Sequence, residues 1–85
     1  MKKNMTIKIA GLPGIKTEQA ILNAEAAVAY AQTSADVEWI SDVYKITKLG
    51  AIRTPSLFIN DELKTSGRIP SVHEVKMWIT EAQKN

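Results

Sequence analysis

The side chains that could do chemistry in this sequence stand in two short stretches. The first is Leu12-Pro13-Gly14-Ile15-Lys16-Thr17, which leads into a predicted helix. Free backbone amides at a helix N-terminus attract anions, and Lys16 adds a positive charge beside them. The second stretch is Thr54-Pro55, which opens directly onto a run of apolar residues. Both stretches predict a site that binds a ligand, and neither supplies a thiol.

Cysteine is absent from all 85 residues. Its absence excludes disulfides, thiolate metal sites and every mechanism in which a thiol of this chain is the nucleophile. Metal binding at His73 is not predicted, because no second histidine or paired carboxylate stands at ligand spacing. Asp61 and Glu62 are adjacent and are expected to make a turn polar rather than to act as paired acids. We therefore expect no metal, no cofactor and no enzymatic activity.

Pro55 is expected to mark the entrance of a strand, because proline cannot donate a hydrogen bond to a β-ladder. An X-Pro bond is also where a cis peptide is tolerated, and we predict that Thr54-Pro55 is cis. This geometry would turn Thr54 outward and leave its backbone groups unpaired at a sheet edge. Such an edge can accept an extended peptide.

Length and composition predict one soluble globular domain over residues 1–85, with 45% hydrophobic and 24% charged residues. The net charge is +2, and the basic excess lies mostly at Lys2, Lys3 and Lys84 near the ends. Nucleic-acid binding is therefore not predicted, because such proteins usually cluster charge on one face. Neither a signal peptide nor a membrane span is visible, so we expect a cytoplasmic protein.

The first half of the chain predicts two strands and two helices. Met5–Ala10 alternates apolar and polar residues, as a strand does. Beyond it, Thr17 is expected to cap a helix whose apolar stripe recurs every three or four residues. Val37–Ile40 predicts a short strand, and Ser41 or Asp42 can cap a brief helix. The stripe of the first helix consists of Ala20, Ile21, Ala24, Ala27, Val28 and Ala31, and the second helix places Val43, Ile46 and Leu49 before a stop at Gly50.

The second half predicts a hairpin and a final helix. Strands Ser56–Asn60 and Glu62–Ser66 are joined by a tight Asn60-Asp61 turn, and Gly67 closes the second strand as a bulge. Ser71 and Glu74 have the spacing of a capping box, with Pro70 and Val75 at its hydrophobic-staple positions. The order β-α-β-α-β-β-α predicts an α/β fold. Its four-stranded mixed sheet has Met5–Ala10 and Ser56–Asn60 at the centre and helices on its faces.

This element order, with Thr-Pro ahead of the third strand, resembles the thioredoxin fold. More specifically, the chain is similar over nearly its whole length to the small thioredoxin-like proteins called redox-active disulfide protein 2. The segments that carry the resemblance are Ile7-Lys8-Ile9, Leu49-Gly50-Ala51-Ile52 before Thr54-Pro55, Phe58-Ile59-Asn60-Asp61, and Ser66-Gly67-Arg68-Ile69-Pro70-Ser71.

In that family the loop after the first strand carries Cys-x-x-Cys, and those positions correspond to Gly14 and Thr17 here. Disulfide exchange needs a thiolate that attacks and a second thiol that resolves, so it does not carry over. The resemblance still implies the fold and a substrate groove beside Pro55. The residues implied for this groove are Leu12, Pro13, Gly14, Ile15, Lys16, Thr17, Thr54, Pro55, Gly67 and Arg68, of which Arg68 has either a ligand contact or a simple surface role.

Three functions remain open from the sequence. The first is a binding module that holds a protein, a peptide, or a small anionic or thiol ligand in the groove. The second is a structural or assembly subunit, a monomer or weak dimer, that packs through Trp39, Tyr44 or Trp78. The third is a thiol-disulfide redox protein whose thiol is supplied in trans. We rank them in that order.

Overall fold

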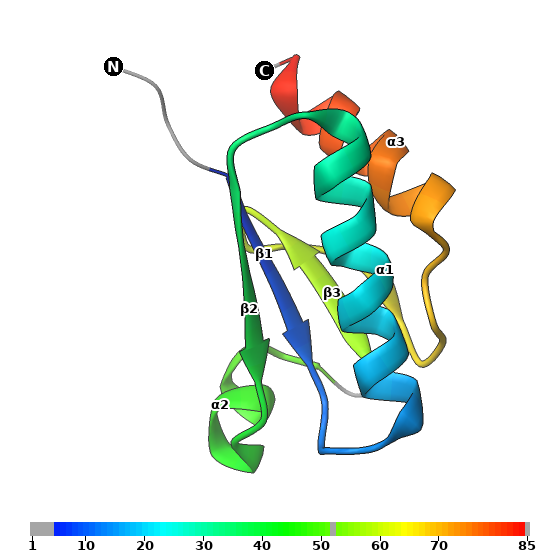
Figure 1. Cartoon of the computed structure of the whole chain (residues 1–85). Helices are drawn as coiled ribbons and strands as arrows, with labels where there is room; N and C mark the ends of the chain where they lie inside the picture. The colour runs from blue at the N-terminus through cyan, green and yellow to red at the C-terminus, as the bar shows by residue number, and fades with distance from the viewer. Residues whose placement is uncertain (1–4, 52, 85) are drawn as a thin grey trace.

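The computed structural model describes residues 5–51 and 53–84, so Lys2, Lys3 and Ile52 of the sequence analysis lie outside the described residues. The described part contains one four-stranded sheet and three helices, as the sequence predicts (Figure 1). In chain order the elements are β1 (Met5–Ala10), α1 (Ile15–Ala31), β2 (Ala35–Ile40), α2 (Val43–Lys48), β3 (Ser56–Ile59), β4 (Glu62–Ser66) and α3 (Val72–Gln83).

The strands lie in the order β2-β1-β3-β4. β1 runs parallel to β2 and antiparallel to β3, and β3 runs antiparallel to β4. The sheet is therefore mixed, and the predicted neighbours β1 and β3 form its centre. This arrangement follows from the connections, because α1 carries the chain back to start β2 whereas a tight turn reverses it between β3 and β4.

The main core lies between the sheet and the helices α1 and α3, which cover the same face (Figure 1). Small alanines on the buried stripe of α1 let that helix approach the larger strand side chains closely. On the opposite face α2 covers a smaller cluster, in which Ile46 packs against Ala10 and Phe58. The buried members of the main core are Met5, Ile7, Ile9, Ala20, Ala24, Ala27, Leu57, Ile59, Val75 and Ile79.

The β3–β4 turn is formed as predicted. Asn60 and Asp61 have positive φ values of 50° and 68°, a conformation that Asn and Asp tolerate better than most residues. The prediction of a bulge at Gly67 is wrong, because the bulge lies elsewhere in β4. The register shifts between Leu57 and Phe58, which leaves Lys64 as the extra residue of β4.

Both later helices begin at the predicted caps. Asp42 accepts hydrogen bonds from the amides of Tyr44 and Lys45 at the start of α2. At α3, Ser71 and Glu74 form the full capping box. Within the described residues, no helix is both long enough and apolar enough to cross a membrane.

Candidate functional site

The two stretches singled out in the sequence meet at one end of the sheet. Ala10, the last residue of β1, pairs with Ser56, the first residue of β3. The chain that leaves β1 at Gly11 therefore lies beside the chain that enters β3 at Pro55 (lower end of Figure 1). The Thr54-Pro55 bond is cis, with Pro55 buried and Thr54 exposed.

Thr17 does not cap α1, contrary to the sequence prediction. The N-cap is Gly14, and Thr17 is the third helical residue, with only 5% of its surface exposed. Its side chain packs against Gly11, where an added Cβ would come within 2.5 Å of Thr17 Oγ1. The first turn of α1 thus passes so close to the end of β1 that a larger residue at position 11 would clash with Thr17. Thr17 forms the floor of the site rather than its surface.

The N-terminus of α1 is left without a side-chain cap, because Gly14 has no side chain that could accept a hydrogen bond. The Gly14 carbonyl accepts from the Glu18 amide at 3.0 Å, which closes the first turn. Lys16 is exposed, and no carboxylate among residues 5–51 and 53–84 forms a salt bridge with it. This end of the helix therefore favours negative charge.

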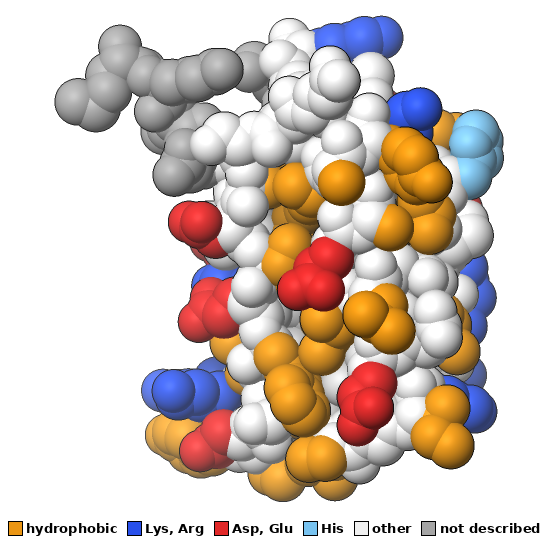
Figure 2. Space-filling model, viewed as in Figure 1, with side chains coloured by type: hydrophobic (Ala, Val, Ile, Leu, Met, Phe, Trp, Pro, Cys, Tyr) orange, Lys and Arg blue, Asp and Glu red, His pale blue; other side chains and the backbone are white. Residues whose placement is uncertain are grey.

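Large apolar side chains surround this end of the molecule. Leu12 is 53% exposed and Ile15 is 86% exposed. Trp39, at 41% exposure, donates from its indole Nε1 to the Gly11 carbonyl at 2.8 Å and so ties β2 to the loop. Figure 2 shows hydrophobic side chains reaching this lower end of the molecule. We call the exposed residues Leu12–Lys16 and Thr54 the loop surface.

Arg68, predicted as a possible ligand contact, is already paired within the chain. Its guanidinium donates to both carboxylate oxygens of Glu74, at 2.8 and 2.7 Å. This pairing, together with the bond from the Ser71 amide, lowers the pKa of Glu74 to about 2. Arg68 therefore stabilises the start of α3, and its fork is not free for a ligand.

Gly67 lies at the site but supplies backbone rather than a contact surface of its own. Its amide donates to the Pro55 carbonyl at 2.9 Å, and its φ of 81° is one that glycine adopts readily. The aliphatic stem of Arg53 packs over it, 3.1 to 3.7 Å from the position of an added Cβ. Arg53 was not predicted from the sequence as a residue of this site. Its position directly before Thr54-Pro55 is a signal that could have indicated it.

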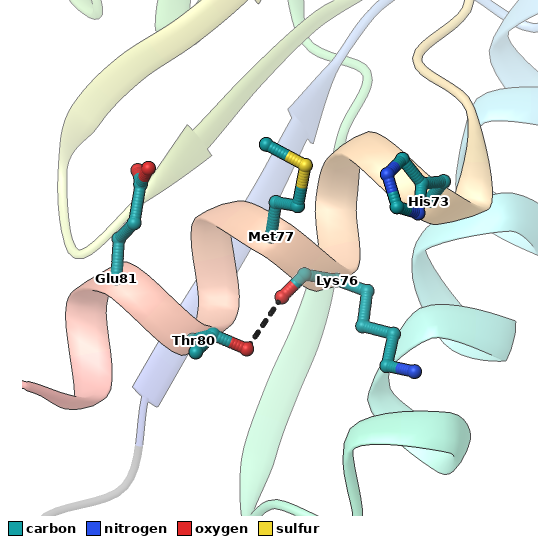
Figure 3. Close-up of a pocket in the computed structure, with 5 residues that line it drawn as sticks. All are labelled: His73, Lys76, Met77, Thr80 and Glu81. Carbon is teal, nitrogen blue, oxygen red and sulfur yellow. Dashed lines mark hydrogen bonds between the residues drawn. The ribbon is translucent and has the colours of Figure 1, made fainter.

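A separate hollow of about 270 Å³ lies on the outer face of α3, away from the loop surface (Figure 3). The Thr80 hydroxyl donates to the Lys76 carbonyl at 3.0 Å, so the helix backbone satisfies this polar group. No group of three potential metal-ligating side chains occurs within the part of the chain that the structure describes. The lining residues are His73, Lys76, Met77, Thr80 and Glu81, all from one helix.

The loop surface brings together features of the helix start and of the strand entrance, and it holds no thiol. It combines an uncapped helix N-terminus, exposed apolar side chains and a chain entering an antiparallel strand, and no cysteine occurs anywhere in the sequence. A family model described as Thioredoxin domain matches residues 5–80. A comparison with curated proteins found no match.

Proposed function

This chain belongs to the thioredoxin domain family, and we propose that it is a non-catalytic member that binds a peptide at the loop surface. One observation carries the proposal: the register between Ala10 and Ser56 brings the loop before α1 next to Pro55 in a chain without cysteine. This proximity supports a binding site at the loop surface, whereas the thiols that disulfide exchange requires are missing.

The exposure of the loop surface supports a peptide as the ligand. Leu12 and Ile15 are large, apolar and more than half exposed, although neither takes part in the core. Exposed apolar residues that stand together, with polar residues around them, are typical of interaction sites. Backbone amides at the uncapped start of α1 can in addition receive a carbonyl or carboxylate of the peptide.

The finer likeness to redox-active disulfide protein 2 is part of this proposal. Under this proposal, Gly14 and Thr17 occupy the positions where that family carries its cysteines. Gly14 is exposed at the N-cap and Thr17 is buried one turn later, so the two positions have unequal access to solvent. We infer that the loop surface is what remains of a redox site after both thiols were lost.

Assembly through aromatic side chains is the second candidate function. Tyr44 on α2 is 68% exposed, which favours it as a contact residue. Trp39 is already bonded to the loop, and Trp78 packs against the main core. The aromatic residues therefore form a weaker case for an interface than the loop surface does.

Affinity selection with a phage-displayed library of random eight-residue peptides tests the proposal. Peptides enriched on the protein are synthesised with a fluorophore, and their Kd is measured by fluorescence anisotropy. Ile15→Glu is expected to abolish binding, because it places a charge at the most exposed apolar position while keeping a residue that suits the first turn of a helix. The matched control is Met77→Glu, which changes an exposed apolar residue of α3.

The variants give opposite expectations for the two candidate functions. A peptide-binding loop surface predicts loss of binding in Ile15→Glu and unchanged binding in Met77→Glu, with both proteins folded by circular dichroism. No enriched peptide on the wild-type protein, or equal binding to Ile15→Glu, would overturn the proposal. Assembly through Tyr44 instead predicts a concentration-dependent mass that Tyr44→Ser abolishes.

A further inference from the structure

We propose that Arg53 determines specificity at the loop surface by binding the carboxylate of an aspartate or glutamate in the peptide. This inference rests on the proposed function and names the chemistry of its ligand. Arg53 is exposed and directly precedes Thr54, which belongs to the loop surface.

Two hydrogen bonds and one packing contact hold Arg53 in place. The Ser66 hydroxyl donates to the Arg53 carbonyl at 3.1 Å, and the hydroxyl of the buried Ser56 also donates to it. The aliphatic stem packs over Gly67, whose own amide is bonded to Pro55. Backbone and stem are thus fixed, and the guanidinium is what is left to interact. A fixed arginine loses less side-chain entropy on binding than a free one.

The charge of Arg53 has no partner within the described part of the chain. The salt bridges there join Lys8 to Asp61, Lys64 to Glu62 and Arg68 to Glu74, and none includes Arg53. The contrast between the two arginines of the sequence is therefore sharp. Two N–H groups of the Arg68 guanidinium donate to Glu74, whereas the Arg53 guanidinium has no salt-bridge partner among residues 5–51 and 53–84.

A peptide carboxylate fits this guanidinium better than an isolated small anion does. The planar fork of arginine matches the two oxygens of a carboxylate. The loop surface also exposes the apolar side chains of Leu12 and Ile15, and a small hydrophilic anion would leave them unused. A peptide with an apolar residue and an acidic residue uses both kinds of contact. Lys16, the other unpaired cation beside the site, adds to the attraction for negative charge.

The test repeats the peptide selection on the wild-type protein and on Arg53→Gln. Glutamine keeps Cβ, Cγ and Cδ, the atoms that pack over Gly67, so the variant is expected to fold, and circular dichroism checks it. Lys76→Gln is the control with the same change in charge, on the outer face of α3. We expect aspartate and glutamate to be enriched at one position on the wild-type protein and on Lys76→Gln, and not on Arg53→Gln.

Affinity measurements on one enriched peptide complete the test. Replacing its acidic residue by the amide, or Arg53 by Gln, should each weaken binding about tenfold, and both together little further. Arg53→Lys should restore only part of the loss, because lysine lacks the fork.

The outcomes separate this inference from the proposed function. Enriched peptides without an acidic preference, or with one that Arg53→Gln leaves intact, overturn the role of Arg53 and leave peptide binding standing. The absence of any enriched peptide overturns both. If affinity instead depends on the free C-terminal carboxylate, or improves only when phosphoserine replaces the acidic residue, the assignment to an acidic side chain is wrong.

Discussion

Substituting Gly11 by alanine should destabilise the protein through a single clash beneath the loop surface. The new Cβ would lie 2.5 Å from Thr17 Oγ1 and 3.2 Å from its Cγ2. Gly11 cannot move aside easily, because its amide donates to the Ile40 carbonyl at 3.0 Å and its carbonyl accepts from Trp39 at 2.8 Å. Its φ is not positive, so the cost is packing and not backbone strain.

The magnitude follows from that contact. Overpacking a well-filled interior costs about 1–3 kcal/mol, and a value near 2 kcal/mol lowers the Tm of a domain of this size by roughly 8–16 °C. Removing Thr17 Oγ1 and Cγ2 leaves the Thr17 Cβ as the nearest atom, at 3.4 Å, an ordinary contact. Gly11→Ala should therefore be almost neutral in a Thr17→Ala background.

Urea unfolding of the wild type, both single variants and the double variant measures this coupling. We expect an interaction free energy of at least about 1 kcal/mol between the two positions. Equal losses for Gly11→Ala in both backgrounds, or a loss below about 0.5 kcal/mol in the wild-type background, would refute the contact between Thr17 and Gly11 that forms the floor of the site.

Further predictions concern the start of α3, the turn under Arg53 and the missing thiols. The pKa of Glu74 lies near 2 instead of 4.5, so its carboxylate stabilises the fold above about pH 4.5 and loses that effect as the pH falls toward 2. Thermal unfolding of the wild type and of Glu74→Gln should show a difference in stability below about 1 kcal/mol at pH 7, because the carboxylate side chain is 34% exposed. The two stabilities should converge as the pH falls from 4.5 to 2. A constant difference down to pH 2 would contradict the pairing with Arg68. Gly67→Ala and Gly50→Ala both place alanine at a φ near +80°, which costs about 1–2 kcal/mol. Only the Cβ at position 67 also meets the stem of Arg53, so urea unfolding should show a larger loss of stability for Gly67→Ala than for Gly50→Ala. Equal losses would show that this stem yields freely. The protein alone should not reduce insulin disulfides in a turbidity assay, and turnover above a buffer control in thioredoxin-free preparations would contradict the need for a thiol of its own.

Local signals in the sequence were sufficient for most of the fold. Ser71 and Glu74 form a capping box whose two hydrogen bonds depend only on residues three apart, and Asn60-Asp61 forms a turn from the backbone preferences of those two residues. The alternation in Met5–Ala10 placed β1 correctly for the same reason. Where the physical cause lies within a few residues, the pattern predicts the structure.

The features that the sequence misplaced or left open depend on residues further along the chain. Threonine is a residue type that is favoured at N-caps, but Thr17 packs against Gly11 of the preceding loop, and the helix begins three residues earlier. For Arg68 the sequence left a ligand contact and a simple surface role open, because its partner Glu74 lies across the turn into α3 and only the fold brings the two together. The bulge at Lys64 depends on how β4 pairs with β3, which no local signal in β4 shows.

Introducing cysteines at Gly14 and Thr17 tests most directly whether the loop surface is a former redox site, as we propose. The backbone of Gly14 is extended, with φ 166° and ψ 171°, and an added Cβ there meets nothing closer than 4.0 Å. Thr17 already holds a side chain of similar size. Both thiols of Gly14→Cys/Thr17→Cys would then stand one turn apart at an uncapped helix N-terminus.

Mass spectrometry first shows whether mild oxidation of this double variant closes a disulfide. The decisive measurement is then the pH dependence of alkylation of the reduced thiol at position 14. An exposed thiol introduced by Thr80→Cys provides the reference. The account predicts a disulfide that forms readily and a thiol whose pKa falls from about 8.5 into the range of roughly 3.5–7.5. Two thiols that stay unpaired under oxidant, with position 14 titrating like the Thr80→Cys reference, would contradict it.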